Sequence, residues 1–455
     1  MRSRILMFTK RCLQAAACVM FATLPCYAGV LAARGSAVGG VSINVEGVLT
    51  PAPAEARKRL LEEMRKAVTA PAGEISKPVE LRMISLKMLE AACADALKNN
   101  FGRLPDEVRF LAGIQRLQYV FVYPEANDIV LAGPGEGWRV DDGGNVVGVT
   151  TGRPVLQLDD LLVAFRSVEA ARQGGISVSI DPTEEGTRRL MDLLSNQRRV
   201  NAMTPQLEAA MKEAFGPQQV TVTGVPATSH FARVLVAADY RMKRIAMKLE
   251  PSPVRELKSY LDLISGQRAS AVNNASPRWW LACNYQPLAT TDDGLAWELR
   301  GPGVKAMTED EVISATGERK ETGRTSRQAQ RWADMMTEQY DALSSQEPIF
   351  GELRNLMDMC VVAALVRKEH LVERAGLSLP LLMDEQSELK SEVWNAPKVI
   401  APEVSFLQGR GSFIVTASGG VAVESWFVAD QKEIVAQVAQ IRQRATPGKQ
   451  AQFWW

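Results

Sequence analysis

One short stretch decides the fold class: Gly174-Gly-Ile-Ser-Val-Ser-Ile-Asp-Pro-Thr-Glu-Glu-Gly186. The two glycines end a helical pattern, because glycine commonly terminates helices. Apolar and polar residues then alternate through residues 176–181, and this period of two predicts a half-buried strand. Pro182 fits the first position of a new helix. Helix, strand and helix follow one another closely, which predicts a sheet with helices packed on it.

The pattern continues on both sides of this stretch. Asp159 or Asp160 can cap the preceding helix, whose inner face is apolar. Further helices are predicted from Thr204-Pro205 and over 228–238, and further strands over 219–225 and 244–249. We therefore expect an α+β fold in which residues 156–268 form a central block of alternating helices and strands.

The rest of the chain divides where its composition changes. Residues 269–277 read as a linker, and a charged run at 309–327 marks a second boundary. Two long helices at 326–343 and 348–372 are expected to pack as an antiparallel pair. The predicted parts are a signal peptide (1–28), an N-terminal α+β region (29–155), the helix–strand block (156–268), a β-rich segment (278–310), and the helical pair with a β-hairpin at 413–416 and 421–428 and a terminal helix (325–455).

The overall charge excludes one class of partner. The 455 residues contain 53 Lys and Arg against 52 Asp and Glu. Proteins that bind nucleic-acid phosphates usually show a basic excess, so no nucleic-acid partner is expected. Hydrophobic residues make up 46% and charged residues 23%, which is typical of a globular protein.

The first 28 residues have the pattern of a secretory signal peptide. Basic residues up to Arg11 precede an apolar run, and Cys26-Tyr27-Ala28 stands before Gly29. The run is shorter than the roughly 20 residues that span a bilayer. The sequence predicts cleavage between Ala28 and Gly29, export to the periplasm or cell envelope, and no transmembrane span after the leader is removed.

Three cysteines remain after this cleavage: Cys93, Cys283 and Cys360. Their spacing fits neither a disulfide framework nor a zinc site. Free cysteines are often buried, so we expect structural roles for all three. Whether one pair forms a disulfide stays open at this point.

The sequence predicts no cofactor and no metal. The glycines at 133–137 resemble a phosphate-binding loop, but residues 138–144 predict a turn and a strand, and a phosphate loop needs a helix there. Only His230 and His370 are present, and they fall in different predicted regions, which does not suit a histidine-ligated metal site.

His230 is the one histidine from which a catalytic triad could be drawn, with Ser229 before it and Asp239 after it. Neighbouring residues on a helix point about 100° apart, so Ser229 and His230 cannot readily share a hydrogen bond. We expect Thr228 or Ser229 to cap the helix and His230 to pack in its first turn. No catalytic residue is predicted.

Adjacent carboxylates occur four times, and caps and turns explain each pair. A glycosidase needs two carboxyl groups facing each other across a cleft, which neighbours in sequence do not supply. Two distant acids could still meet in the fold, so a hydrolase remains the alternative. The pairs are Asp141/Asp142, Asp159/Asp160, Glu184/Glu185 and Asp292/Asp293.

Three tryptophans are candidate contacts for a ligand or a partner. Trp279-Trp280 and Trp297 fall on two strands that are predicted to pair. At least one ring would then face outward, where it could stack on a ligand, a glycan or a partner. The other interpretation is that these rings fill the seam between domains.

Several stretches along the chain are similar to those of a known family. They are Asp128-Ile-Val-Leu-Ala-Gly-Pro-Gly-Glu-Gly-Trp138 followed by Arg139, Gly152-Arg-Pro154, Ser179-Ile-Asp-Pro-Thr-Glu-Glu-Gly186, Gly224-Val-Pro226, His230-Phe-Ala232, Ala238-Asp-Tyr-Arg-Met-Lys243, Glu352-Leu-Arg-Asn-Leu-Met-Asp358 and Ser418-Gly-Gly-Val421. With these stretches the chain resembles a planctomycete family of exported proteins that carries domain of unknown function 1598. The similarity runs from about residue 39 to about residue 423 and implies export and a lineage. It brings no established activity and no site residues.

Together these features predict an exported, non-catalytic protein of the periplasm or cell envelope that acts through a binding surface. Its partner would be an unidentified protein or envelope component. The alternative is a carboxylate-dependent hydrolase of the cell envelope. A deep pocket with converging acids would favour the enzyme, whereas a flat or apolar patch would favour the interaction protein.

Overall fold

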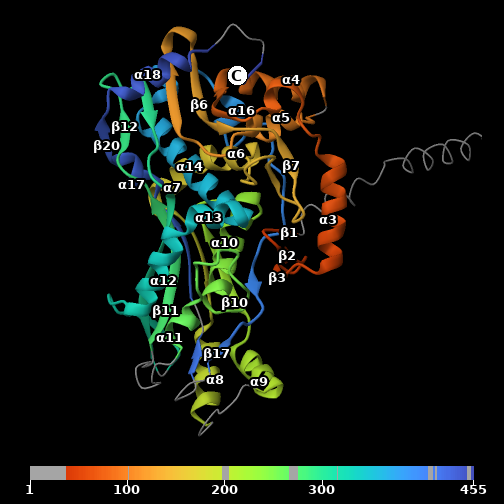
Figure 1. Cartoon of the computed structure of the whole chain (residues 1–455), viewed down its shortest axis with the longest axis vertical. Helices are drawn as coiled ribbons and strands as arrows, with labels where there is room; N and C mark the ends of the chain where they lie inside the picture. Colours follow the sequence, from red (N-terminus) through yellow and green to blue (C-terminus); the bar gives the residue numbers. More distant parts are fainter. Residues whose placement is uncertain are drawn as a thin grey trace, which may run out of the picture.

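The computed structural model describes residues 37–100, 102–196, 204–265, 275–314, 316–407, 413–415, 418–447 and 452–455. The predicted signal peptide and its cleavage site at Ala28–Gly29 lie outside these residues. The described chain combines helices with mixed sheets, so the predicted α+β class is confirmed. Figure 1 shows the larger sheet toward one end of the long axis and the smaller sheet toward the other.

The larger sheet has ten strands that come from distant parts of the chain. Parallel pairing joins β16 to β3 and β11 to β19, and the other neighbours pair antiparallel. The N-terminal region, the central block, the β-rich segment and the C-terminal part therefore share one sheet. Its order is β1 (Ala37–Val38), β2 (Val41–Ile43), β3 (Val48–Pro51), β16 (Val399–Ile400), β10 (Gln218–Thr223), β9 (Ile176–Asp181), β19 (Ser418–Val423), β11 (Ala275–Asn284), β14 (Gly303–Ile313) and β15 (Arg319–Glu321).

The smaller sheet has six strands, and its central strands β5 and β6 form the predicted hairpin through a turn at 124–127. Two further pairs, β7 with β8 and β17 with β18, stand apart from both sheets. The strands are β20 (Lys432–Ile434), β12 (Leu288–Thr290), β13 (Ala296–Glu298), β5 (Tyr119–Tyr123), β6 (Asp128–Gly135) and β4 (Val79–Ser85), then β7 (Trp138–Val140), β8 (Val146–Gly148), β17 (Ser405–Leu407) and β18 (Phe413–Val415).

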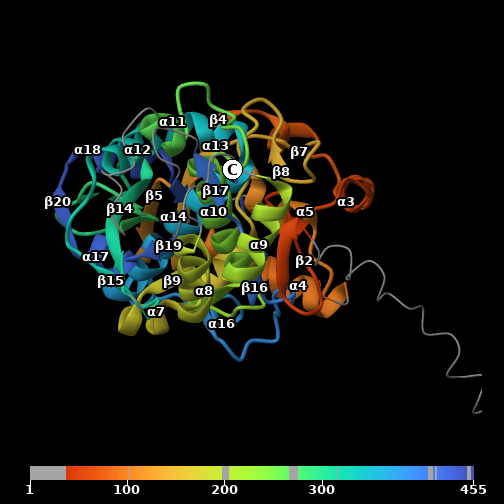
Figure 2. The same cartoon turned by 90° about the horizontal axis from the view of Figure 1, so that it is seen from below.

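Two long helices form the centre of the core. Helix α10 (His230–Ala246) packs on β9 and β19, and α14 (Pro348–Lys368) packs against α10 and α6 (Leu158–Arg166). Most of their residues are buried, and one continuous apolar cluster includes residues of both sheets. Figures 1 and 2 both place α10 and α14 in the interior.

The other helices surround this centre. Helix α12 packs on β14, α8 packs on α9, and α17 packs on α14. They are α3 (Ala54–Ala67), α4 (Leu86–Asn99), α5 (Asp106–Arg109), α7 (Val168–Gly174), α8 (Glu184–Ser195), α9 (Pro205–Phe215), α11 (Tyr260–Ile264), α12 (Arg327–Glu338), α13 (Tyr340–Gln346), α15 (Leu371–Arg374), α16 (Pro380–Met383), α17 (Ser425–Asp430) and α18 (Gln437–Arg444), with short 3₁₀ turns at Gly73–Ser76, Leu111–Gly113 and Pro124–Ala126.

The predicted strand at 244–249 is wrong, because α10 continues through Ala246. Met242, Ile245 and Ala246 are all buried, at the three- and four-residue spacing of a helix face. Over so short a window, the alternation of charged and apolar residues imitates a strand.

The predicted hairpin of 413–416 with 421–428 is also wrong. Strand β18 pairs with β17, whereas β19 lies between β9 and β11 in the larger sheet. Residues from Ser425 onward form α17. The predicted helix at 326–343 is divided at Gln339 into α12 and α13. Partners that are distant in the sequence decide these pairings.

The C-terminal residues pack on the body of the protein. The backbone N–H of Ser85 donates to the carbonyl of Phe453 at 2.8 Å, and Met83 and Trp455 exchange hydrogen bonds of 3.0 and 3.1 Å. The guanidinium of Arg82 lies 5.1 Å from the centre of the Trp454 ring. Of the helices in the described ranges, none has the length and apolar character required to cross a bilayer.

Candidate functional site

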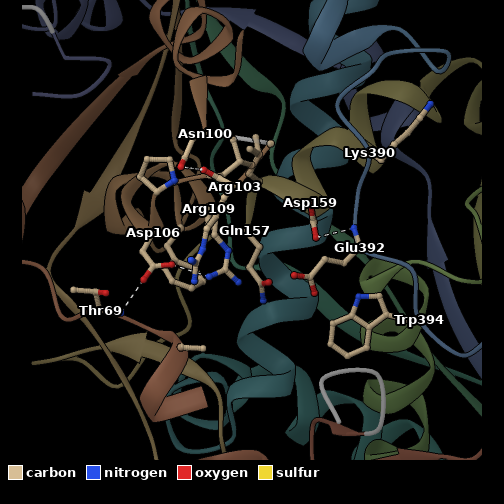
Figure 3. A pocket seen from close by; sticks show the side chains of 16 residues that line it. Thr69, Asn100, Arg103, Asp106, Arg109, Gln157, Asp159, Lys390, Glu392 and Trp394 are labelled. Atoms are coloured by element: carbon tan, nitrogen blue, oxygen red, sulfur yellow. Dashed lines mark hydrogen bonds and ion pairs between the residues drawn. The ribbon is translucent and has the colours of Figure 1, made fainter. Parts of the chain in front are cut away.

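A cavity of about 550 Å³ lies where α6 begins, beside the α4–α5 connection and the segment 390–394 (Figure 3). It combines acidic, basic and amide side chains with one indole ring. The lining residues are Ala67, Thr69, Asn100, Gly102, Arg103, Leu104, Pro105, Asp106, Arg109, Phe110, Gln157, Leu158, Asp159, Lys390, Glu392 and Trp394.

The start of α6 places two neighbouring carboxylates in different surroundings. Asp159 and Asp160 both lie in the first turn, where negative charge is favourable because the helix dipole is positive there. Successive helix residues point about 100° apart. Asp159 therefore reaches the cavity, while Asp160 is buried against α10.

Asp159 meets Glu392 in the cavity. The backbone N–H of Glu392 donates to Oδ2 of Asp159 at 3.3 Å, and both carboxyl groups point into the same space (Figure 3). Burial, and then the negative charge of Glu392, raise the pKa of Asp159 to about 6. The carboxyl group of Asp159 therefore changes between its protonated and its ionised form close to neutral pH.

Trp394 forms the wall behind these carboxylates. Its backbone N–H donates to the carbonyl of Thr228 at 2.7 Å, which fixes the segment against the start of α10. Its ring lies 5.2 Å from the His230 ring, and the Arg233 guanidinium lies 4.9 Å from its centre. The indole N–H is buried without a hydrogen-bond partner among the described residues. A buried donor without a partner is uncommon in folded proteins, which marks this ring as unusual.

His230 lies behind Trp394 and not in the cavity. Ser229 caps α10, since its hydroxyl accepts from the N–H of Ala232 at 3.1 Å, and His230 occupies the first turn at 7% exposure. Nδ1 of His230 lies 3.0 Å from Asp160. Burial by itself would lower the pKa of His230, but the charge and hydrogen bond of Asp160 raise it to about 9. His230 is therefore a buried cation at neutral pH, which does not suit a general base.

The structure does not bring Ser229, His230 and Asp239 together as a triad, in agreement with the structural role expected for His230. Asp239 binds Nζ of Lys243 at 2.8 Å, and the Ser229 hydroxyl donates to the Pro226 carbonyl at 2.7 Å. Asp160 takes the place beside His230. His370 lies far along the chain at the start of α15, where it is exposed.

Glu352 completes the buried group behind Trp394. It lies on α14, and one of its carboxyl oxygens has no partner in the described chain. Burial raises its pKa to about 7, while the positive charge of His230 acts in the opposite direction. The pocket thus has a second layer of titratable groups, formed by Asp160, His230 and Glu352.

Cations stand at the other side of the cavity. Arg109 pairs with Asp106 at 2.7 Å, and Asp106 also accepts from the backbone N–H of Thr69 at 2.7 Å. Arg103 is exposed at the rim on this side, whereas Lys390 is exposed on the side of Glu392 and points away from the cavity (Figure 3). The cavity therefore has an acidic end, at Asp159 and Glu392, and a more basic end.

The three predicted tryptophan contacts do not lie together. Trp279 and Trp280 are on β11, which pairs with β14 and β19, whereas Trp297 is on β13 in the other sheet, so the predicted pairing of their strands is wrong. Trp279 is 0% exposed and packs on Tyr260 and Trp332; Trp297 is 1% exposed. Trp280 is half-buried on the opposite face of β11.

All three described cysteines are free. Burial raises the pKa of Cys93 and of Cys283 to about 12 and raises that of Cys360 well above its usual value. Thiols with such high pKa values are poor nucleophiles at neutral pH. Among the described residues, no group of three or more metal-ligating side chains is close enough to hold an ion.

Sequence reasoning missed Glu392 and Trp394 and assigned Asp159 to a helix cap. The sequence shows the Asp159/Asp160 pair. That Asp159 faces the cavity and Asp160 the core depends on how α6 faces α10, which the sequence does not show. The segment 390–394 has no periodic pattern, so nothing in the sequence places it beside α6. The one sequence feature that could have indicated this segment is a tryptophan in a mostly polar stretch without a helix or strand pattern.

Comparison with known families adds one match. Residues 178–260 match the model of a family described as protein of unknown function, DUF1598. This supports the resemblance to that domain. The matched part includes β9, β10 and α10 with His230, whereas Asp159, Glu392 and Trp394 lie outside it. Neither the curated proteins nor the solved structures gave a match.

Proposed function

We propose that this protein is an exported binding protein of the periplasm or cell envelope, and that its cavity binds a small polar ligand carrying an amino group. The leader pattern of residues 1–28 and the resemblance to planctomycete exported proteins support export. The binding role rests on the cavity formed by α6, the α4–α5 connection and residues 390–394.

The observation that carries the proposal is the meeting of Asp159, Glu392 and the unpaired indole N–H of Trp394. An ammonium group between the two carboxylates would relieve their repulsion, which contributes to the raised pKa of Asp159. The indole N–H is buried, so a small rotation of the Trp394 ring would let an oxygen next to that ammonium accept from it. Amino acids and amino sugars carry both groups.

The basic side of the cavity agrees with such a ligand. Arg103 at the rim would attract a carboxylate or another acidic substituent at the far end of the ligand. Gln157 lies between the two sides and offers both a donor and an acceptor (Figure 3).

The test is calorimetric titration of the mature chain with a panel of amino acids, amino sugars, polyamines and neutral sugars. We expect an amine to bind and D159N to weaken it by about tenfold or more, because a buried charge pair is lost. Asp292 is exposed, so D292N is the matched control and should bind normally. Binding of neutral sugars alone, or full affinity in D159N, would contradict the proposed ligand class.

The same ligand predicts a pH dependence of binding. Asp159 must be ionised to hold an ammonium group, and its pKa is raised to about 6 by burial and by Glu392. Affinity should therefore fall as the pH drops through 6 and should be constant between about pH 7 and 8. In D159N this step should disappear.

The second candidate is a carboxylate-dependent hydrolase, and the raised pKa of Asp159 favours it. A carboxyl group that keeps its proton near pH 6 can act as a general acid, and Glu392 would supply the second carboxylate. Incubation with chromogenic aryl glycosides tests this candidate. Release of the aryl group by the wild-type chain and its loss in D159N would support the hydrolase, and no release would remove it.

A further inference from the structure

A second hollow, of about 300 Å³, lies on the larger sheet beside Trp280. Side chains alternate along β11, so Trp279 and Leu281 are buried while Trp280 and Asn284 are partly exposed on the other face. Helix α17 forms the rim, and both views place it beside this part of the sheet (Figures 1 and 2).

The register of the strands explains why the hollow exists. One row across the sheet runs Thr221, Ser179, Gly420, Trp280, Met307, with paired residues on the same face. The next row runs Thr223, Ser177, Ala422, Ala282, Lys305. The small residues Ala422 and Ala282, which line the hollow, leave one flank of the indole ring open.

The indole ring of Trp280 is held in place by a neighbouring cation. The guanidinium of Arg278 lies 5.6 Å from the Trp280 ring and is itself paired with Glu321. A ring that is already fixed loses little freedom when a ligand stacks on it. Phe427 on α17 stands at the rim and is 62% exposed. An exposed phenyl group next to a partly open indole provides an apolar platform.

The residues around the hollow indicate which kind of ligand it can bind. Both edges of β11 are hydrogen-bonded, to β14 and to β19, so an extended peptide cannot add to this strand. Lys305 and Glu424 bring one charge of each sign, which does not favour a phosphate group. The remaining polar groups are the amides of Asn284, Gln286 and Gln431, which suit hydroxyl groups.

We infer that this face of the sheet is a carbohydrate-binding site, with a sugar ring stacked on Trp280 and Phe427. The C–H face of a pyranose is apolar, and its rim carries hydroxyls within reach of the three amides. The two rows continue with Ser179, Ser177, Thr221 and Thr223, whose hydroxyls lie on the same face, and Ser177 and Thr223 are 2.7 Å apart. This strip would receive further units of an oligosaccharide.

The test uses the mature chain on an array of neutral, N-acetylated and acidic oligosaccharides, followed by titration of the best one. We expect binding to that oligosaccharide, about tenfold or more weaker binding in W280A, and recovery in W280F, because the stacking surface returns. F427A should weaken binding to a smaller degree. V312A, at an exposed position on β14 away from the hollow, is the matched control and should bind normally.

Thermal unfolding of each variant separates lost binding from lost folding. D159N alters the other cavity and should leave oligosaccharide binding unchanged, so this inference and the proposed ligand pocket can fail separately. No bound oligosaccharide on the array, or wild-type affinity in a folded W280A, would overturn the inference.

Discussion

Helix α14 carries two buried carboxyl groups less than two turns apart, and their surroundings are opposite. Asp358 is 0% exposed, binds Arg116 through both oxygens at 3.0 and 3.3 Å, and accepts from the Tyr285 hydroxyl at 2.6 Å. Glu352 has one oxygen without a partner among the described residues and a pKa raised to about 7 by burial. Both oxygens of Asp358 therefore have hydrogen-bond partners. Glu352 belongs with Asp160 and His230 to the buried group behind the cavity.

The difference in hydrogen bonding distinguishes buried carboxyl groups that stabilise the fold from those that serve a binding site. A buried carboxylate with all its hydrogen bonds made contributes to the fold, because removing it leaves its partners uncompensated. A carboxylate with a raised pKa next to a cavity lowers stability when it ionises, and such groups concentrate at binding and catalytic sites. Asp159 and Glu352 share this second character, and the buried indole N–H of Trp394 beside them has no partner among the described residues.

The largest effect is expected at the closed network. D358A would leave Arg116 unpaired, with its side chain 14% exposed, and remove the partner of Tyr285. We expect the free energy of unfolding to fall by about 3–5 kcal/mol. Urea denaturation measures it, and a loss below about 1 kcal/mol would contradict the assignment of this network to the fold.

A smaller loss of stability is expected when His230 is replaced, since its ion pair with Asp160 is buried but lies next to the cavity. The pKa of His230 is raised to about 9 by Asp160, against the effect of burial, so the pair stabilises the fold fully below about pH 6.5 and loses this contribution as the pH rises through 9. H230Q should therefore cost about 2 kcal/mol at pH 6. The difference from wild type should shrink between pH 7 and 10, and a pH-independent difference would contradict the charged pair.

The rim of the cavity should have the smallest effect on stability. Lys390 is exposed and lines the cavity. K390Q should change the free energy of unfolding by no more than about 0.5 kcal/mol. Its side chain points away from the cavity (Figure 3), so calorimetry should also show unchanged ligand binding. A large loss of stability would place Lys390 in the fold and not at the rim.

The sequence predicted the parts of the fold that depend on local patterns. Alternation from Ile176 to Asp181 appears as β9, and the expected cap before His230 appears as Ser229. Pro182 was expected to open the next helix, but α8 begins at Glu184 with Thr183 as its cap. A shift of this size is within the usual uncertainty of helix ends.

The candidate site depends on contacts that no local pattern encodes. Asp159 and Glu392 are more than two hundred residues apart in the chain, and only the packing of α6 against the segment 390–394 brings them together. The ten-stranded sheet joins β16 to β3 and β19 to β11 in the same way. The hydrophobic period and the composition of a segment predict whether it is a helix or a strand. Which segments then pack together depends on the shapes of both partners.

The central claim is that Asp159 is kept for ligand binding at a cost to stability, in contrast to Asp358. Burial and Glu392 raise its folded-state pKa to about 6 from an ordinary value of 3.8, so its ionisation destabilises the fold as the pH rises through that interval. The most direct measurement is the free energy of unfolding of wild type and D159N from pH 4 to pH 8. The account predicts near-equal values at pH 4. One pKa unit corresponds to about 1.4 kcal/mol, so above pH 6 the D159N variant should be more stable by about 2–3 kcal/mol. A D159N variant that is less stable than wild type at pH 7 to 8 would contradict it and would make Asp159 a structural carboxylate like Asp358.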